Sequence, residues 1–135
     1  MINEKQIKQF KEDGFVLVPE LFNKSEITEI LEYTEKLQTK PEVSGEEWKY
    51  FEESKLDKNE KVLARIENFC KFHKGFNYLC SNSRIMDCVN DCFGEKGILF
   101  KDKINFKMPG GAGFTPHEDS QAGWDDYCLL YTSDA

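Results

Sequence analysis

The sequence has few long apolar runs, and we expect none of its segments to direct the chain into or across a membrane. Its first residues, 1–14, are polar and contain no apolar run resembling a signal peptide. No stretch is long and apolar enough to cross a bilayer as a helix. A surplus of positive charge is also missing, because the net charge is −7 and the pI is about 4.9. We therefore expect neither a membrane nor a nucleic acid as the main partner, whereas a local basic face that binds a small anion is compatible with this charge.

The sequence also lacks a disulfide-like or zinc-binding cysteine motif. The five cysteines include no CxxC motif, and their number is odd. Together with the missing signal peptide, this favours reduced thiols and a cytoplasmic location. Cys88 and Cys92 lie one helical turn apart, but we interpret them as small hydrophobic residues rather than as zinc ligands.

The 135 residues suit one small domain, and 39% hydrophobic and 32% charged residues are ordinary for a globular protein. Hydrophobic periodicity, capping residues and glycine stops predict the elements. We expect helices over 3–13, 23–38, 69–80 and 83–93, strands over 15–18 and 98–108, and a loop over 40–59. The order is mostly helical and then β, so the sequence predicts an α+β fold whose sheet begins late.

Residues 100–108 alternate between two kinds of side chain. Phe100, Ile104, Phe106 and Met108 fall on one face, with Asp102 as the exception, and Lys101, Lys103, Asn105 and Lys107 fall on the other. One interpretation is a strand with a dry and a wet side. The other is a polar side that binds an anionic ligand, because lysine and asparagine donate hydrogen bonds to carboxylates.

A glycine-rich turn, Pro109–Gly113, precedes two residues of chemical interest. The turn lacks the GK[ST] ending of a phosphate-binding loop. His117 and Asp119 are two apart, so in an extended segment they point the same way and can bind one metal ion. They make up two of the three ligands of the facial triad that holds non-heme iron. The alternative is an accidental pair of surface residues, and the sequence alone leaves both open.

Three segments of the chain together resemble the phytanoyl-CoA dioxygenase family of Fe(II)- and 2-oxoglutarate-dependent oxygenases. They are FKEDGFVLV at 10–18, RIENF at 65–69, and KDKINFKMPGG at 101–111 leading to PHED at 116–119. The resemblance implies N-terminal helices and a double-stranded β-helix (jelly-roll) core. His117 and Asp119 would bind Fe(II), Lys103 and Asn105 would bind 2-oxoglutarate, and Lys101 and Lys107 are weaker candidates. Dioxygen would be the oxidant, and an aliphatic or acyl-type small molecule the substrate to be hydroxylated.

The end of the chain departs from this family. Members carry a distal histidine and an arginine downstream, but no histidine follows His117 and no arginine follows Arg84. Residues 128–135 resemble a translated sequencing adapter. We therefore expect 1–127 to be the N-terminal part of a phytanoyl-CoA dioxygenase-like domain with an incomplete core, and 128–135 to be a non-native tail. The parent protein would be an enzyme, and the fragment alone would be inactive.

Two other functions fit the same residues. One is a non-enzymatic jelly-roll binding domain that has lost its metal. The other is a small metal-binding protein that uses His117, Asp119 and cysteines to hold zinc or another ion.

Overall fold

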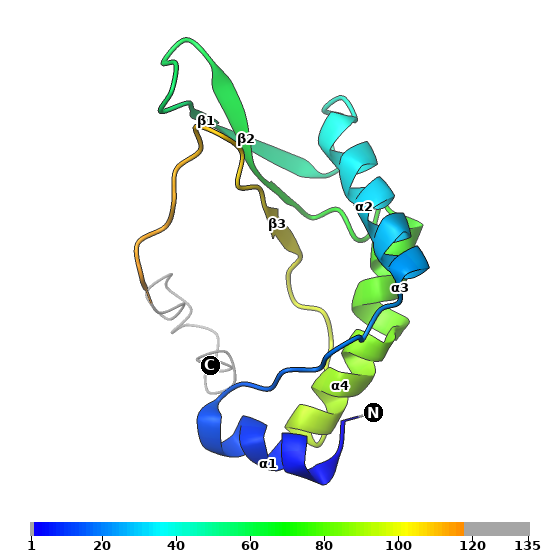
Figure 1. The fold of residues 1–135 in the computed structure, drawn as a ribbon. Coiled ribbons are helices and arrows are strands. Elements are labelled where there is room, and N and C mark those ends of the chain that lie inside the picture. The colour runs from blue at the N-terminus through cyan, green and yellow to red at the C-terminus, as the bar shows by residue number, and fades with distance from the viewer. Residues whose placement is uncertain (1, 118–135) are drawn as a thin grey trace.

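The computed structural model of this chain describes residues 2–117, which form helices and strands in mixed order (Figure 1). The elements are α1 (Glu4–Asp13), α2 (Lys24–Thr39), β1 (Trp48–Glu53), β2 (Lys61–Glu67), α3 (Lys74–Asn82), α4 (Arg84–Phe93) and β3 (Lys103–Asn105). The described part is therefore a mixed α and β structure, as predicted. Asp119 and the expected tail, 128–135, lie outside the described residues.

Helices α1, α2 and α4 begin and end within one residue of the predicted bounds. Asn3 and Asn23 each form a capping box at the start of α1 and α2, in which the asparagine side chain accepts a backbone N–H and the third helical residue reaches back. Gly14 and Gly94 take left-handed conformations just after α1 and α4, which most residues disfavour. Helix α3 is shorter than predicted, because residues 69–73 form a turn and His73 caps the helix through Nδ1.

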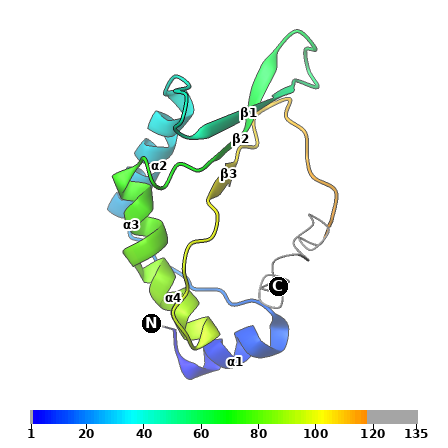
Figure 2. The ribbon, with the colours of Figure 1, turned by 180° about the vertical axis from the view of Figure 1, so that it is seen from behind.

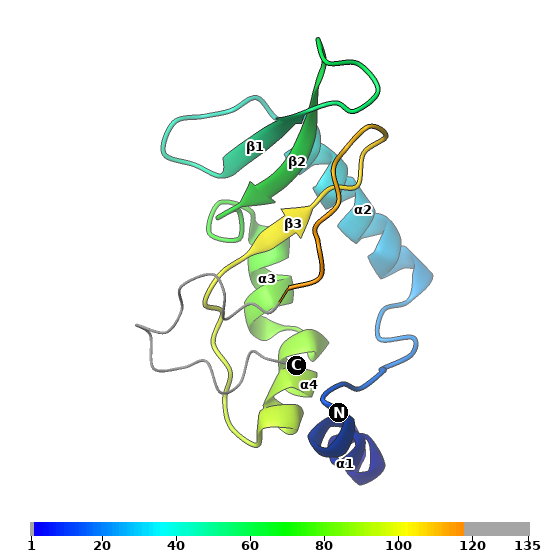
Figure 3. The ribbon, with the colours of Figure 1, turned by 90° about the vertical axis from the view of Figure 1, so that its left-hand side faces the viewer.

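Strands β1, β2 and β3 form one antiparallel sheet in that order, and Figure 3 shows them side by side. Tyr50 pairs with Arg65, but the next residue, Phe51, pairs with Leu63. Ala64 is therefore the extra residue of a β-bulge, which reverses the facing of the residues beyond it. As a result Leu63 and Ile66, although three apart, both face the core.

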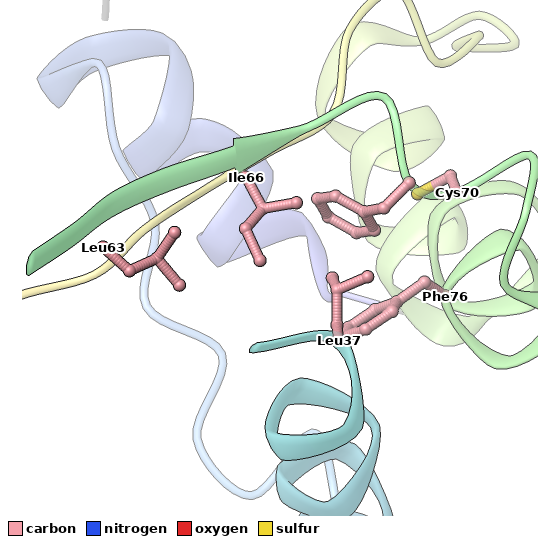
Figure 4. Close-up of a cluster of buried hydrophobic side chains, with 6 residues drawn as sticks. Leu37, Leu63, Ile66, Cys70 and Phe76 are labelled. Carbon is pink, nitrogen blue, oxygen red and sulfur yellow. The ribbon is translucent and has the colours of Figure 1, made fainter. Parts of the chain in front are cut away.

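The core joins the sheet to the helices. It is formed by buried side chains from α2, β2, α3 and the turn after β2, namely Leu37, Leu63, Ile66, Phe69, Cys70 and Phe76 (Figure 4). Ile66 is fully buried. Seen from the front and from behind, α2, α3 and α4 line one side, the sheet lies at one end and α1 lies at the other end (Figures 1 and 2). The face of the sheet that carries Ile66 therefore packs against the core, and the opposite face carries polar side chains.

Three predictions about the strands are wrong. Residues 15–18 form no strand, because no described segment pairs with them. The side chains of Phe15 and Leu17 are 61% and 73% exposed. The predicted loop over 40–59 contains β1, so the sheet begins before α3 rather than late in the chain. The strand expected over 98–108 is regular only over Lys103–Asn105, where it pairs with β2.

Candidate functional site

The alternation predicted for residues 100–108 is present from Lys101 onward. On the inner side Asp102, Ile104, Phe106 and Met108 are half-buried, whereas Lys101, Lys103, Asn105 and Lys107 are exposed. Phe100, which the sequence placed inside, is 69% exposed. Pairing with β2 explains the pattern, because Ile104 lies opposite Ile66 and is carried against the core.

Asp102, the polar exception on the inner side, has a structural role. Its carboxylate accepts hydrogen bonds from the backbone N–H groups of Phe69 at 3.0 Å and Cys70 at 2.9 Å. Both donors belong to the turn after β2, where residues are buried and no helix or strand supplies acceptors. Asp102 therefore fixes the start of β3 to the end of β2.

The polar residues of β3 belong to a surface that crosses all three strands. Asn105 pairs with Arg65, which pairs with Tyr50, and Lys103 pairs with Glu67, which pairs with Trp48. Residues that pair directly across antiparallel strands project from the same face. We call these six residues, together with Lys101, the exposed sheet face; it lies opposite the side that carries Ile66.

A buried carboxylate lies within the exposed sheet face. The Glu67 side chain is only 6% exposed, and its oxygens lie 3.0 Å from Arg65 Nε and 3.2 Å from Lys101 Nζ. The Arg65 guanidinium also lies over the Tyr50 ring, 4.1 Å from its centroid. Lys107 extends elsewhere, with Nζ 4.7 Å from the centroid of the Phe114 ring.

Sequence reasoning assigned no site role to Tyr50, Arg65 or Glu67. Arg65 and Glu67 flank the fully buried Ile66, so an alternating pattern was available in this segment. The bulge at Ala64 obscured it, because Leu63, Ile66 and Phe69 repeat at a spacing of three rather than two.

The turn after β3 is anchored to the β1–β2 hairpin. Gly111 N donates to Met108 O at 2.9 Å, and Gly110 has a φ of 83°, as the third residue of a type II turn requires. Gly110 O accepts from Lys55 N at 2.8 Å, and a Cβ on Gly110 would meet Ser54 Oγ at 2.4 Å. The predicted glycine turn is confirmed, and its conformation and packing both require glycine at position 110.

His117 follows this turn and is the last residue that the structure describes. Its Nδ1 is 2.7 Å from the backbone oxygen of Thr115, which can only accept, so Nδ1 carries the proton. In that tautomer Nε2 holds the lone pair that a metal ion needs, as is usual for metal-binding histidines. The imidazole therefore fits a metal ligand. The pairing of His117 with Asp119 lies outside the described residues.

The described residues contain no group of three histidine, cysteine or acidic side chains arranged to hold a metal ion. Cys88 is buried and Cys92 half-buried in α4, in keeping with a hydrophobic role. A cavity of about 480 Å³ lies between α2 and the α3–α4 pair. Its lining, which includes Tyr33 and Arg84, contains none of the predicted site residues. No helix in the described part is long and apolar enough to cross a membrane.

Comparison with known proteins identifies relatives over most of the chain. The family model described as phytanoyl-CoA dioxygenase (PhyH) matches residues 10–127. A 2-aminoethylphosphonate dioxygenase of an uncultured bacterium, HF130_AEPn_1, is 40% identical over 119 residues, covering 88% of this chain and 45% of that protein. A methylphosphonate hydroxylase of Gimesia maris is 31% identical over 122 residues, covering 90% and 45%.

A third relative, from Stutzerimonas stutzeri, is named "Probable alpha-ketoglutarate-dependent hypophosphite dioxygenase" and is 28% identical over 116 residues, covering 85% of this chain and 41% of that protein. The chain thus spans less than half the length of each of these three relatives. No solved structure gave a significant match.

Proposed function

Because the chain belongs to the phytanoyl-CoA dioxygenase family, we propose that its protein is a non-heme Fe(II)- and 2-oxoglutarate-dependent dioxygenase that hydroxylates a small molecule. The names of the three relatives, all dioxygenases or hydroxylases, support this activity. The observation in the structure that carries the proposal is the His117 imidazole, whose Nδ1 donates a hydrogen bond to the backbone oxygen of Thr115.

The proposed metal ligands within this chain are His117, through Nε2, and Asp119. The Nδ1–H bond to Thr115 orients the imidazole ring and sets its tautomer before any metal binds. When bound, the iron with 2-oxoglutarate and dioxygen supplies the oxidising chemistry that converts a C–H bond into an alcohol. A jelly-roll core, with further ligands on other strands, is part of the same proposal.

Lys103 and Asn105 are the proposed contacts for 2-oxoglutarate, with Lys101 and Lys107 in supporting roles. Lys103 and Asn105 are exposed on the same side of β3, at the edge of the described sheet. The lysine ammonium and the asparagine amide both donate hydrogen bonds to a carboxylate. Lys101 is partly neutralised by Glu67, and Lys107 lies over Phe114, so we expect both to contribute less.

We propose a small phosphorus oxyanion, such as an alkylphosphonate, as the substrate class. The relatives are named for 2-aminoethylphosphonate, methylphosphonate and hypophosphite, which share an oxygen-bearing phosphorus centre. An alkylphosphonate also offers the aliphatic C–H bonds that the family resemblance implied. The positive charges of the exposed sheet face suit such an anion.

The test is anaerobic addition of Fe(II) and 2-oxoglutarate to the protein expressed from its full reading frame. We expect a weak visible charge-transfer band, lost in His117→Ala and kept in the matched control His73→Asn, which retains a helix-capping side chain. A band that survives His117→Ala would refute the ligand assignment. Absence of the band in the unaltered protein would favour the non-enzymatic binding domain. The cytoplasmic location and the absence of nucleic-acid and membrane partners stay predictions.

A further inference from the structure

The guanidinium of Arg65 is held on two sides by residues of the neighbouring strand and its own strand. One face lies over the Tyr50 ring, 4.1 Å from its centroid, which is a cation–π contact. One edge, at Nε, lies 3.0 Å from Glu67 Oε1, in an ion pair that does not include a hydrogen bond from Nε. A long flexible side chain that is fixed in this way has already lost much of the conformational entropy that binding a ligand would cost.

The other edge of the same guanidinium carries the two terminal nitrogens. Within residues 2–117 neither terminal nitrogen donates a hydrogen bond, and the Arg65 side chain is 36% exposed. A guanidinium presents its donors as a rigid planar fork that matches two oxygens of a phosphoryl group or a carboxylate. Arg65 therefore offers a preoriented donor pair on the exposed sheet face.

The charges around this fork favour an anion. Arg65, Lys101 and Lys103 are cationic, and the single carboxylate among them, Glu67, is buried and engaged with Arg65 and Lys101. Glu67 balances one positive charge, so the group retains two. On β3, Asn105 stands opposite Arg65 of β2, and Lys103 stands opposite Glu67.

We propose that Arg65 anchors the phosphorus oxyanion headgroup of the substrate, with Tyr50 and Glu67 as the residues that position it. This inference rests on the proposed function and adds the substrate contact. The phosphonate and the 2-oxoglutarate carboxylates share the chemistry that a guanidinium recognises, and both are anions. Lys103 and Asn105 face the cosubstrate in the proposed function, so the fork one strand away is assigned to the substrate.

Binding without iron tests the assignment separately from catalysis. Methylphosphonate and 2-oxoglutarate are titrated individually into the iron-free protein from the full reading frame, and heat is measured by calorimetry. Arg65→Lys keeps the charge but removes the fork, so we expect methylphosphonate affinity to fall by about tenfold or more and 2-oxoglutarate affinity to change by less than about twofold. The matched control is Lys61→Gln, at the exposed start of the same strand.

Several outcomes overturn the proposal. The first is an unchanged affinity of Arg65→Lys for methylphosphonate. The second is an equal loss of affinity for methylphosphonate and for 2-oxoglutarate in this variant. The third is a lack of methylphosphonate binding by the unaltered protein. Loss of the iron-dependent band with methylphosphonate binding intact would instead refute the proposed activity alone. Thermal melting of each variant reports folding.

A second set of variants covers the case in which Arg65→Lys fails to fold. Tyr50→Leu removes the ring under the guanidinium, while Tyr50→Phe keeps it. We expect weaker methylphosphonate binding only in Tyr50→Leu, since the ring rather than the hydroxyl positions Arg65. Equal affinity in the two variants would overturn the positioning role and, with it, the anchor.

Discussion

The Glu52 carboxylate accepts a hydrogen bond from the backbone N–H of Ala112 at 2.7 Å, across sixty residues of sequence. This bond ties β1 to the segment that continues to His117. Gly110 O, which accepts from Lys55 N at 2.8 Å, adds a second tie to the same hairpin. The hairpin therefore anchors residues 110–112, five residues before the candidate metal ligand.

Replacing Glu52 with alanine should loosen this support. A hydrogen bond to a charged acceptor contributes about 1.5–3 kcal/mol, and the half-buried position of Glu52 reduces the expected loss to about 1 kcal/mol. We expect faster hydrogen exchange at the Ala112 amide and a lower midpoint in urea. Glu53→Ala is the control, because Glu53 is the next residue in the same strand and its side chain is exposed. Equal exchange rates at Ala112 in the two variants would contradict the role given to Glu52.

Gly110→Ala should destabilise the turn strongly. A φ of 83° disfavours any residue with a Cβ, and that Cβ would approach Ser54 Oγ to 2.4 Å. The expected loss is about 1–3 kcal/mol of unfolding free energy, measured by denaturant titration. Gly113→Ala, where a Cβ meets no atom within 4 Å, should change stability by less than about 0.5 kcal/mol. If both variants lose a similar amount of unfolding free energy, the conformation of Gly110 does not explain the loss.

Asp102→Ala should reduce stability because it removes the acceptor of two backbone donors. Phe69 and Cys70 are 3% and 2% exposed, so water cannot readily replace the lost hydrogen bonds. We expect a loss of about 2–4 kcal/mol in urea unfolding. Asp102→Asn keeps one carbonyl oxygen and should lose less. If the asparagine variant proves as unstable as the alanine variant, the charge rather than the two bonds matters.

Glu26 and Arg84 join α2 to α4, and the Arg84 side chain also lies over the Phe22 ring. The hydrogen bond from Arg84 lowers the pKa of Glu26 from its usual value, and the backbone N–H bond at Asn23 adds to this effect. A carboxyl group with a lowered folded-state pKa contributes stability above its unfolded pKa, and this contribution is lost as the pH falls through the folded pKa.

Arg84→Gln should therefore lower the melting temperature at neutral pH and have a smaller effect in acid. The comparison is made at about pH 7 and about pH 3, on either side of the ordinary carboxyl pKa. The difference in melting temperature between the variant and the unaltered protein should be smaller at the lower pH. A constant difference at both pH values would assign the effect of Arg84 to its packing on Phe22.

Local signals in the sequence were sufficient to predict helices α1, α2 and α4. Asn3, Asn23 and Gly94 act on backbone groups within a few residues, so the starts of α1 and α2 and the end of α4 follow from neighbouring residues. The exposed face of β3 and the turn at Gly110 were predicted for the same reason. The metal ligands were predicted as a pair, and only the His117 member lies in the described part.

The strands and the exposed sheet face could not be predicted locally, because they depend on contacts between residues distant in sequence. Residues 15–18 look like a strand, but the described segments provide no partner, whereas the charged β1 is a strand because β2 pairs with it. Arg65 and Glu67 join the site only because β2 lies beside β3, with the bulge at Ala64 setting which side they face.

By itself, the sequence determined the α1, α2 and α4 helices, the lysine-rich face of residues 101–107 and the family of the protein, because these depend on residue type and short spacing. Only the tertiary structure decided that Tyr50, Arg65 and Glu67 stand beside that face, and that Glu52 holds the segment leading to His117. Strand pairing joins residues far apart in the chain, and its register depends on a bulge that no local pattern specifies.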